Sequence, residues 1–163
     1  MLSSAEKKQG MQYALQEAAK AAECGEVPIG AAIVDPEGTV IGRGHNRREQ
    51  DQDATQHAEI LAIRAANQTL KSWRLEDCSL FVTLEPCCMC AGAIINARIK
   101  TVYYGTPDPK AGAAGSVVNL FQLQALNHHP SLVPGLYREQ ASQLLKTFFQ
   151  TLRRQQKAIK RGK

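Results

Sequence analysis

LEPCCMCAGA, residues 84–93, carries three cysteines within four positions: Cys87, Cys88 and Cys90. The apolar run CSLFVTL, 78–84, leads into it and predicts a buried strand. Pro86 follows, and proline is favoured at the first position of a helix, so we expect it to open a helix over CCMCAGAIINA, 87–97. The stretch is therefore a strand followed directly by a helix, with the thiols at the junction.

Helix and strand patterns alternate on both sides of this junction. Apolar spacing predicts helices over 4–24, 57–67 and 137–158, strands over 28–34, 39–45 and 100–105, and loops over 46–55 and 105–116. Residues 119–126 favour a short helix, and residues 128–134 an irregular segment that contains one short strand. We expect Asp53 or Thr55 to cap the helix at 57, and the Gly- and Pro-rich loop 105–116 to be ordered and functional. The order predicts an α/β fold with helices on both faces of one sheet.

Length and composition fit one domain over residues 1–163. No apolar run near the amino terminus looks like a signal peptide, and none is long enough for a membrane helix, so we expect a cytoplasmic protein without membrane contact. Five cysteines, an odd number without a secretory signal, argue against a disulfide framework. Cys24 and Cys78 lie outside any motif, and we expect them to be buried or half-buried thiols.

Positive charge is concentrated at the carboxyl terminus. Residues 140–163 hold seven Lys/Arg and no acid, whereas residues 1–139 hold 13 Lys/Arg and 15 Asp/Glu, which accounts for the net charge of +5. Such a block is a plausible phosphate-binding surface, and its alternative interpretation is a solvated helix end.

The spacing of the thiols divides them into two groups. Three helical positions are about 300° of rotation, so Cys87 and Cys90 share one face of the helix while Cys88 points away. Two thiolates at a helix start suit zinc, and His57, which also begins a helix, is the candidate third ligand. Three protein ligands would leave a position for water, with Glu59 available as general acid/base. On a regular helix His57 and Glu59 would lie about 200° apart, so both can face one site only if His57 is at the helix edge.

The paired motifs carry a resemblance to a known family. CxxC alone also occurs in structural zinc sites and redox proteins, but His57-Ala58-Glu59 with Pro86-Cys87-Cys88-Met89-Cys90 resembles the signature of zinc nucleobase deaminases. EVPIGAAIV, GRGHN, the TxHAEI pattern of 55–60, LFVTLEPCxMCAGAI, DPKAGAAGS and the FF…RRQ pattern of the last helix are similar to bacterial tRNA wobble adenosine deaminases of the TadA type. The similarity covers about residues 10–157.

This resemblance implies a three-layer α/β/α, cytidine deaminase-like domain with a mixed sheet of about five strands and a basic carboxyl-terminal helix over about 137–160. It implies one Zn²⁺ per subunit on His57, Cys87 and Cys90, with Glu59 shuttling protons. A zinc-activated water would replace the amino group of adenine in the tRNA anticodon stem-loop, leaving inosine and ammonia. The implied substrate-binding residues are Asn46, Ala58, Ile29, Asp108, Lys110 and Phe149.

A homodimer is also expected from the resemblance alone. Two other functions remain open at this point. A zinc deaminase of a free base or nucleoside, such as guanine or cytidine, would have no use for the basic tail. A non-catalytic zinc module would need a fourth protein ligand, for which Cys88 is the candidate.

Overall fold

Five strands form one mixed sheet in the order β2-β1-β3-β4-β5 in the computed structural model, which describes residues 1–162. The strands are β1 (Gly30–Val34), β2 (Val40–His45), β3 (Ser79–Leu84), β4 (Thr101–Thr106) and β5 (Ser131–Pro134). β1 is antiparallel to both β2 and β3, whereas β3, β4 and β5 run parallel. The expected mixed sheet of about five strands is confirmed.

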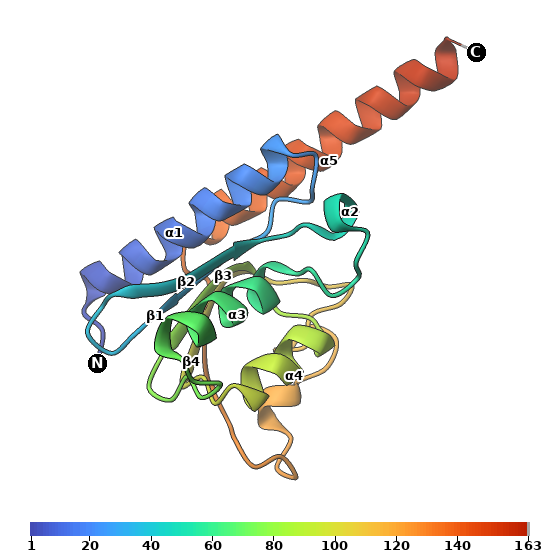
Figure 1. Ribbon diagram of the computed structural model, residues 1–163. Coiled ribbons are helices and arrows are strands. Elements are labelled where there is room, and N and C mark those ends of the chain that lie inside the picture. The colour runs from blue at the N-terminus through green and yellow to red at the C-terminus, as the bar shows by residue number, and fades with distance from the viewer. Residues whose placement is uncertain (163) are drawn as a thin grey trace.

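Helices cover both faces of the sheet, as expected for three layers (Figure 1). α1 (Ser4–Glu23) and α5 (Arg138–Arg161) lie side by side on one face, and α3 (Ala58–Leu70) and α4 (Cys88–Asn96) lie on the other. The loop predicted over 46–55 contains one short helix, α2 (Arg48–Asp51). The helix expected at 119–126 is only a three-residue 3₁₀ turn, η1 (Leu120–Gln122).

The sheet has a hydrophobic core on each side. The larger core lies against α3 and α4 and includes Ile33, Leu80 and Ile94, which are fully buried. On the side of α1, Phe81 stacks on Tyr103 with ring centroids 4.7 Å apart. The central strands β1 and β3 are thus covered on both faces, which explains their continuous apolar sequence.

Gly44 sets the distance between β2 and α3. A Cβ atom at this position would lie 2.5 Å from the carbonyl oxygen of Ala58 and 2.7 Å from the backbone nitrogen of Ala62. Since no real side chain tolerates such contacts, the glycine lets the first turns of α3 pack directly on the strand. The start of α3, where His57 lies, is fixed by this close approach.

Three further local predictions were wrong. Pro86 precedes the N-cap residue Cys87 of α4 and is not the first helical residue. Neither Asp53 nor Thr55 caps α3, because His57 takes the N-cap position and Asp53 instead accepts hydrogen bonds from the backbone N–H and hydroxyl of Thr55. Cys24, the C-cap residue of α1, is exposed, whereas Cys78 is buried as expected.

In the described part of the chain, residues 1–162, every helix is too short or too polar to cross a bilayer.

Candidate active site

The ends of four strands meet at one edge of the sheet. β2, β3 and β4 all finish there, and β1, which runs antiparallel to β2 and β3, begins there. A cavity of about 620 Å³ opens at this edge. It is walled by the starts of α3 and α4, by the loop of residues 107–116 that follows β4, and by one side of α5. Strand ends at a sheet edge are a common place for ligands in α/β proteins.

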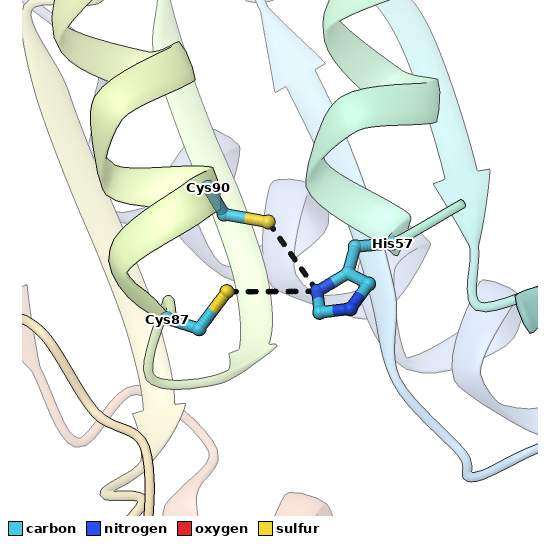
Figure 2. Close-up of side chains that lie close together, drawn as sticks. All are labelled: His57, Cys87 and Cys90. Carbon is cyan, nitrogen blue, oxygen red and sulfur yellow. Dashed lines mark hydrogen bonds between the residues drawn. The ribbon is translucent and has the colours of Figure 1, made fainter. Parts of the chain in front are cut away.

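His57, Cys87 and Cys90 form the only cluster of potential metal ligands found among residues 1–162. Figure 2 shows the two thiols of α4 pointing at the imidazole that begins α3. The Nδ1 atom of His57 lies 3.7 Å from the sulfur of Cys87 and 3.5 Å from that of Cys90. Cys88 is exposed and outside the cluster. The division of the three thiols into a facing pair and a bystander is therefore observed.

The donor set fits a zinc ion. A tetrahedral ion with Zn–N and Zn–S bonds of ordinary length needs nitrogen and sulfur ligands about 3.6 Å apart. The two distances from His57 bracket this value. Imidazole and thiolate are also ligands that zinc prefers. His57, Cys87 and Cys90 are thus arranged as a three-ligand site for this metal.

His57 is an N-cap residue with φ −81° and ψ 152°, so its backbone is extended rather than helical. This conformation removes the difficulty that a regular helix would place His57 and Glu59 about 200° apart. Both residues line the same cavity. Cys87 likewise is the N-cap of α4 with an extended backbone, at φ −77° and ψ 175°.

Hydrogen bonding favours an anionic sulfur at Cys87. A hydrogen bond from the thiol of Cys90, assisted by His57, lowers the pKa of Cys87 to about 3. The same pairing raises the pKa of Cys90, and the contact with Cys87 raises the pKa of His57. Only Cys87 is thus in the form that binds a metal, and an ion at this cluster would have to displace the protons of Cys90 and His57.

Glu59 is a buried carboxyl group at the wall of the cavity, with 4% of its surface exposed. Burial raises the pKa of Glu59 to about 7, because desolvation disfavours the charged form. A carboxyl group that takes up and releases a proton near neutral pH suits general acid/base chemistry. Its position next to the thiol–imidazole cluster is where a proton-transfer group would be needed.

All six residues implied as substrate contacts line the cavity: Asn46, Ala58, Ile29, Asp108, Lys110 and Phe149. The amide of Asn46 donates to the carbonyl of Val27 and accepts from the backbone N–H of Arg48, each at 3.2 Å. These bonds hold the end of β2 and fix how the amide faces the cavity. Phe149 contributes a partly exposed ring from α5. The sequence reasoning missed one cation on the cavity wall, Arg48, whereas Lys146 and Arg153 belong to the basic segment 140–163 that it proposed as a phosphate-binding surface.

Glu85 is a further lining residue that the sequence patterns did not single out. It lies one residue beyond β3 and only 2% of its surface is exposed. Burial alone would raise the pKa of Glu85, but hydrogen bonds from Ser116, Asp108 and Ala114 hold it below its usual value. The available sequence signal was an acidic residue at a strand end, directly before Pro86 and Cys87. Its hydrogen-bond partners lie more than 20 residues further along the chain, so the sequence alone did not indicate them.

α5 extends the cavity wall into a basic, solvent-exposed helix. Its first half packs beside α1 and against β4, and Figure 1 shows its second half projecting beyond the rest of the fold. Residues 150–162 are all exposed. Arg153 therefore marks the transition from the cavity to a free helical arm that carries Arg154, Lys157, Lys160 and Arg161.

Comparison with known proteins places this site in a family. The family model for MafB19-like deaminase matches residues 5–153. The chain is 46% identical over 152 residues to a tRNA-specific adenosine deaminase of Bacillus subtilis, covering 93% of this chain and 94% of that protein.

Solved structures agree with this assignment. One from a study of A-to-I editing by tRNA:A34 deaminases at the wobble position of transfer RNA superposes with a TM-score of 0.81 at 46% identity, over 84% of this chain and 99% of the other. A guanine deaminase from Nitrosomonas europaea superposes with a TM-score of 0.74 at 27% identity, over 86% of this chain and 83% of the other. Sequence, fold and ligand cluster agree, and the chain belongs to the deaminase family that contains the tRNA-specific adenosine deaminases.

Proposed function

We propose that this protein hydrolytically deaminates adenosine to inosine at the wobble position of the tRNA anticodon. The observation that carries the proposal is the buried Glu59 beside the His57–Cys87–Cys90 cluster, in a cavity whose mouth is continuous with a basic helix. The 46% identity to a protein named tRNA-specific adenosine deaminase supports this substrate. The whole chain, residues 1–163, acts as a single deaminase domain in this proposal.

His57, Cys87 and Cys90 hold one Zn²⁺, and zinc in such a site activates a water molecule for attack. Glu59 accepts a proton from the attacking water and transfers it to a ring nitrogen of adenine. It then takes the remaining proton from the newly added hydroxyl group and passes it to the departing amino group, so water and adenosine become ammonia and inosine. The burial of Glu59 serves this role, since the raised pKa lets the carboxyl group hold a proton at neutral pH and release it again.

The remaining wall of the cavity receives the base and its flanking nucleotides. Ile29 offers an apolar surface and Asn46 an amide that can pair with a base edge, while the backbone of Ala58 lies beside them at the start of α3. The target adenine must leave its stack to enter, and anticodon loops already present splayed bases. Phe149 is placed to stack on a neighbouring base.

Cations surround the entrance and continue along α5. Lys110, Lys146 and Arg153 line the cavity, and the exposed part of α5 adds four more cations without any acid. This charge is suited to the phosphates of an anticodon stem-loop. The similarity to the guanine deaminase of Nitrosomonas europaea would otherwise suggest deamination of free guanine. The basic surface favours tRNA instead, because a free base carries no phosphates for these cations to bind.

Two further properties belong to the proposal. Cytoplasmic localisation follows from a tRNA substrate. A homodimer would cover apolar side chains that the single chain leaves exposed, including Met89 of α4 and Val117 and Val118 of the following loop. Light scattering of the zinc-loaded protein would measure the number of chains.

The decisive experiment compares substrates. The zinc-loaded protein is incubated separately with tRNA, adenosine, cytidine and guanine, while released ammonia and the product base are quantified. We expect ammonia and inosine from tRNA alone. Turnover of free guanine or cytidine with none on tRNA would replace this proposal with the free-base activity.

A further inference from the structure

Glu85 connects the metal cluster to the loop that carries Asp108 and Lys110. Both carboxylate oxygens are fully used by donors from this 107–116 loop. One oxygen accepts from the backbone N–H of Asp108 at 2.9 Å and from the hydroxyl of Ser116. The other accepts from the backbone N–H of Ala114 at 2.9 Å and of Ser116 at 3.0 Å. One side chain therefore fixes both ends of the loop.

The loop packs so closely on Glu85 that position 112 requires glycine. A Cβ atom at Gly112 would collide with the carboxylate of Glu85 and would lie 2.6 Å from the carbonyl oxygen of Asp108. Gly112 also forms an isolated antiparallel bridge with Cys87, and the backbone N–H of Ala113 donates to the carbonyl of Pro86 at 2.8 Å. The loop thus wraps around Glu85 while touching the residues that start α4.

We infer that Glu85 is a positioning residue for the tRNA substrate, which sets the 107–116 loop at a fixed place relative to Cys87. This inference rests on the proposed function. Glu85 itself has no hydrogen-bonding capacity left in the direction of a base, because its oxygens are saturated by the loop. Its effect passes through Asp108 and Lys110, which share the cavity wall with the base-binding residues.

A glutamine at this position provides a sharp test. With its NH₂ group on one side, Glu85→Gln would face the backbone N–H groups of Ala114 and Ser116. With its NH₂ group on the other side, it would face the backbone N–H of Asp108, while the hydroxyl of Ser116 can turn to accept. Either orientation leaves at least one backbone donor of the loop without its acceptor. The matched control is Glu76→Gln, which makes the same change at an exposed acid paired with Arg74. Both variants are prepared as zinc-loaded, full-length chains.

Three measurements are made. The first is zinc content, and the second is amide hydrogen exchange at Asp108, Ala114 and Ser116. The third is the steady-state kinetics of tRNA deamination, which gives KM and kcat. For Glu85→Gln we expect zinc to remain, the three amides to exchange faster, and KM to rise on the order of tenfold while kcat changes by less than about threefold, since a buried donor has lost its acceptor. Glu76→Gln should match the wild type in all three. A purely structural role would lower zinc content and kcat together instead.

Unchanged exchange, an unchanged KM, or loss of zinc in Glu85→Gln would each overturn the inference. If that variant does not fold, Ser116→Ala removes one donor from the same carboxylate and should raise KM by about two- to fivefold with zinc retained. An unchanged KM for this variant would count against the inference as well. A wild-type protein that forms no inosine would instead refute the proposed function, whereas the exchange measurement would still report whether Glu85 holds the loop.

Discussion

The Nδ1 atom of His57 lies 3.5 Å from the sulfur of Cys90, although 33 residues separate them in the chain. His57 lies at the start of α3 and Cys90 in the first turn of α4, and both helices cover the same face of the sheet. The chain passes along α3 and returns along β3, which brings the start of α4 back beside the start of α3. Burial of Cys90 and half-burial of His57 keep both side chains in place. The site is therefore organised by the fold itself.

Replacing each thiol in turn tests the ligand assignment. Cys87→Ser or Cys90→Ser should lose both zinc and deaminase activity, because a hydroxyl is a poor zinc ligand. Cys88→Ser, the matched control one residue away, should retain both, since its side chain is exposed and outside the cluster. Zinc is measured by elemental analysis per chain. Loss of zinc in Cys88→Ser would contradict the assignment.

Removal of the buried carboxyl group separates chemistry from metal binding. Glu59→Ala should keep zinc but reduce kcat for inosine formation by at least about 10²- to 10⁴-fold, which is the usual contribution of a general acid/base. Glu23→Ala, at the exposed end of α1, is the control and should behave as the wild type. Persistent inosine formation by Glu59→Ala would exclude the role given to this residue.

The His57–Cys87–Cys90 cluster was predictable because its information is local. Two thiols three residues apart and a histidine that starts a helix are visible in the sequence, and the structure places all three within 4.8 Å of one another. The sequence could only state that His57 must lie outside the regular helix if it is to face the same site as Glu59. The extended backbone of His57 fulfils this requirement.

The role of Glu85 could not be read in the same way, because it depends on the path of a loop that returns from residue 116 to residue 85. The caps were misjudged for a related reason. Asp53 has a suitable side chain for capping α3, but it is occupied by Thr55 within its own turn. The hydrophobic pattern does not predict which of two nearby groups a polar side chain will bind.

Gly44 in β2 and Gly92 in α4 allow a matched test of packing. Gly44→Ala should destabilise the protein by about 1–3 kcal/mol, because its methyl group would push the start of α3 away from β2. Gly92→Ala in α4 should instead stabilise by up to about 1 kcal/mol, because nothing lies within 4 Å of the new methyl group and alanine favours helix. Urea denaturation measures both. A loss of stability in Gly92→Ala would contradict this account.

The exposed part of α5 should provide salt-sensitive affinity. The double variant Lys157→Gln/Lys160→Gln is expected to weaken tRNA binding and to lower the slope of log affinity against log salt by about 1 for each phosphate that a replaced lysine neutralised. Lys7→Gln/Lys8→Gln near the start of α1 removes the same charge from another helix and should leave the slope nearly unchanged. Equal effects of the two pairs would indicate that only net charge matters.

Glu17 should make stability depend on pH in the acidic range. Its carboxylate is buried and contacts Lys20 Nζ at 2.7 Å and His45 Nδ1 at 2.9 Å. Burial opposes ionisation, but these two partners lower the pKa below the ordinary value of 4.5. The stabilisation is therefore complete above about pH 4.5 and disappears as pH falls through the lowered pKa. Glu17→Gln should flatten the acid limb of thermal unfolding against pH, and an unchanged limb would contradict this account.

All five cysteines are free, so no disulfide ties residues 1–162 together. An ion held by His57 and Cys90 would act as a clasp between α3 and α4, closing a segment of 33 residues that otherwise depends on packing alone. Binding of the ion would then raise the free energy of unfolding, because an ion that binds only the folded state stabilises that state. Under the zinc assignment proposed above, removal of the metal by a chelator should therefore lower the free energy of unfolding as well as abolish activity.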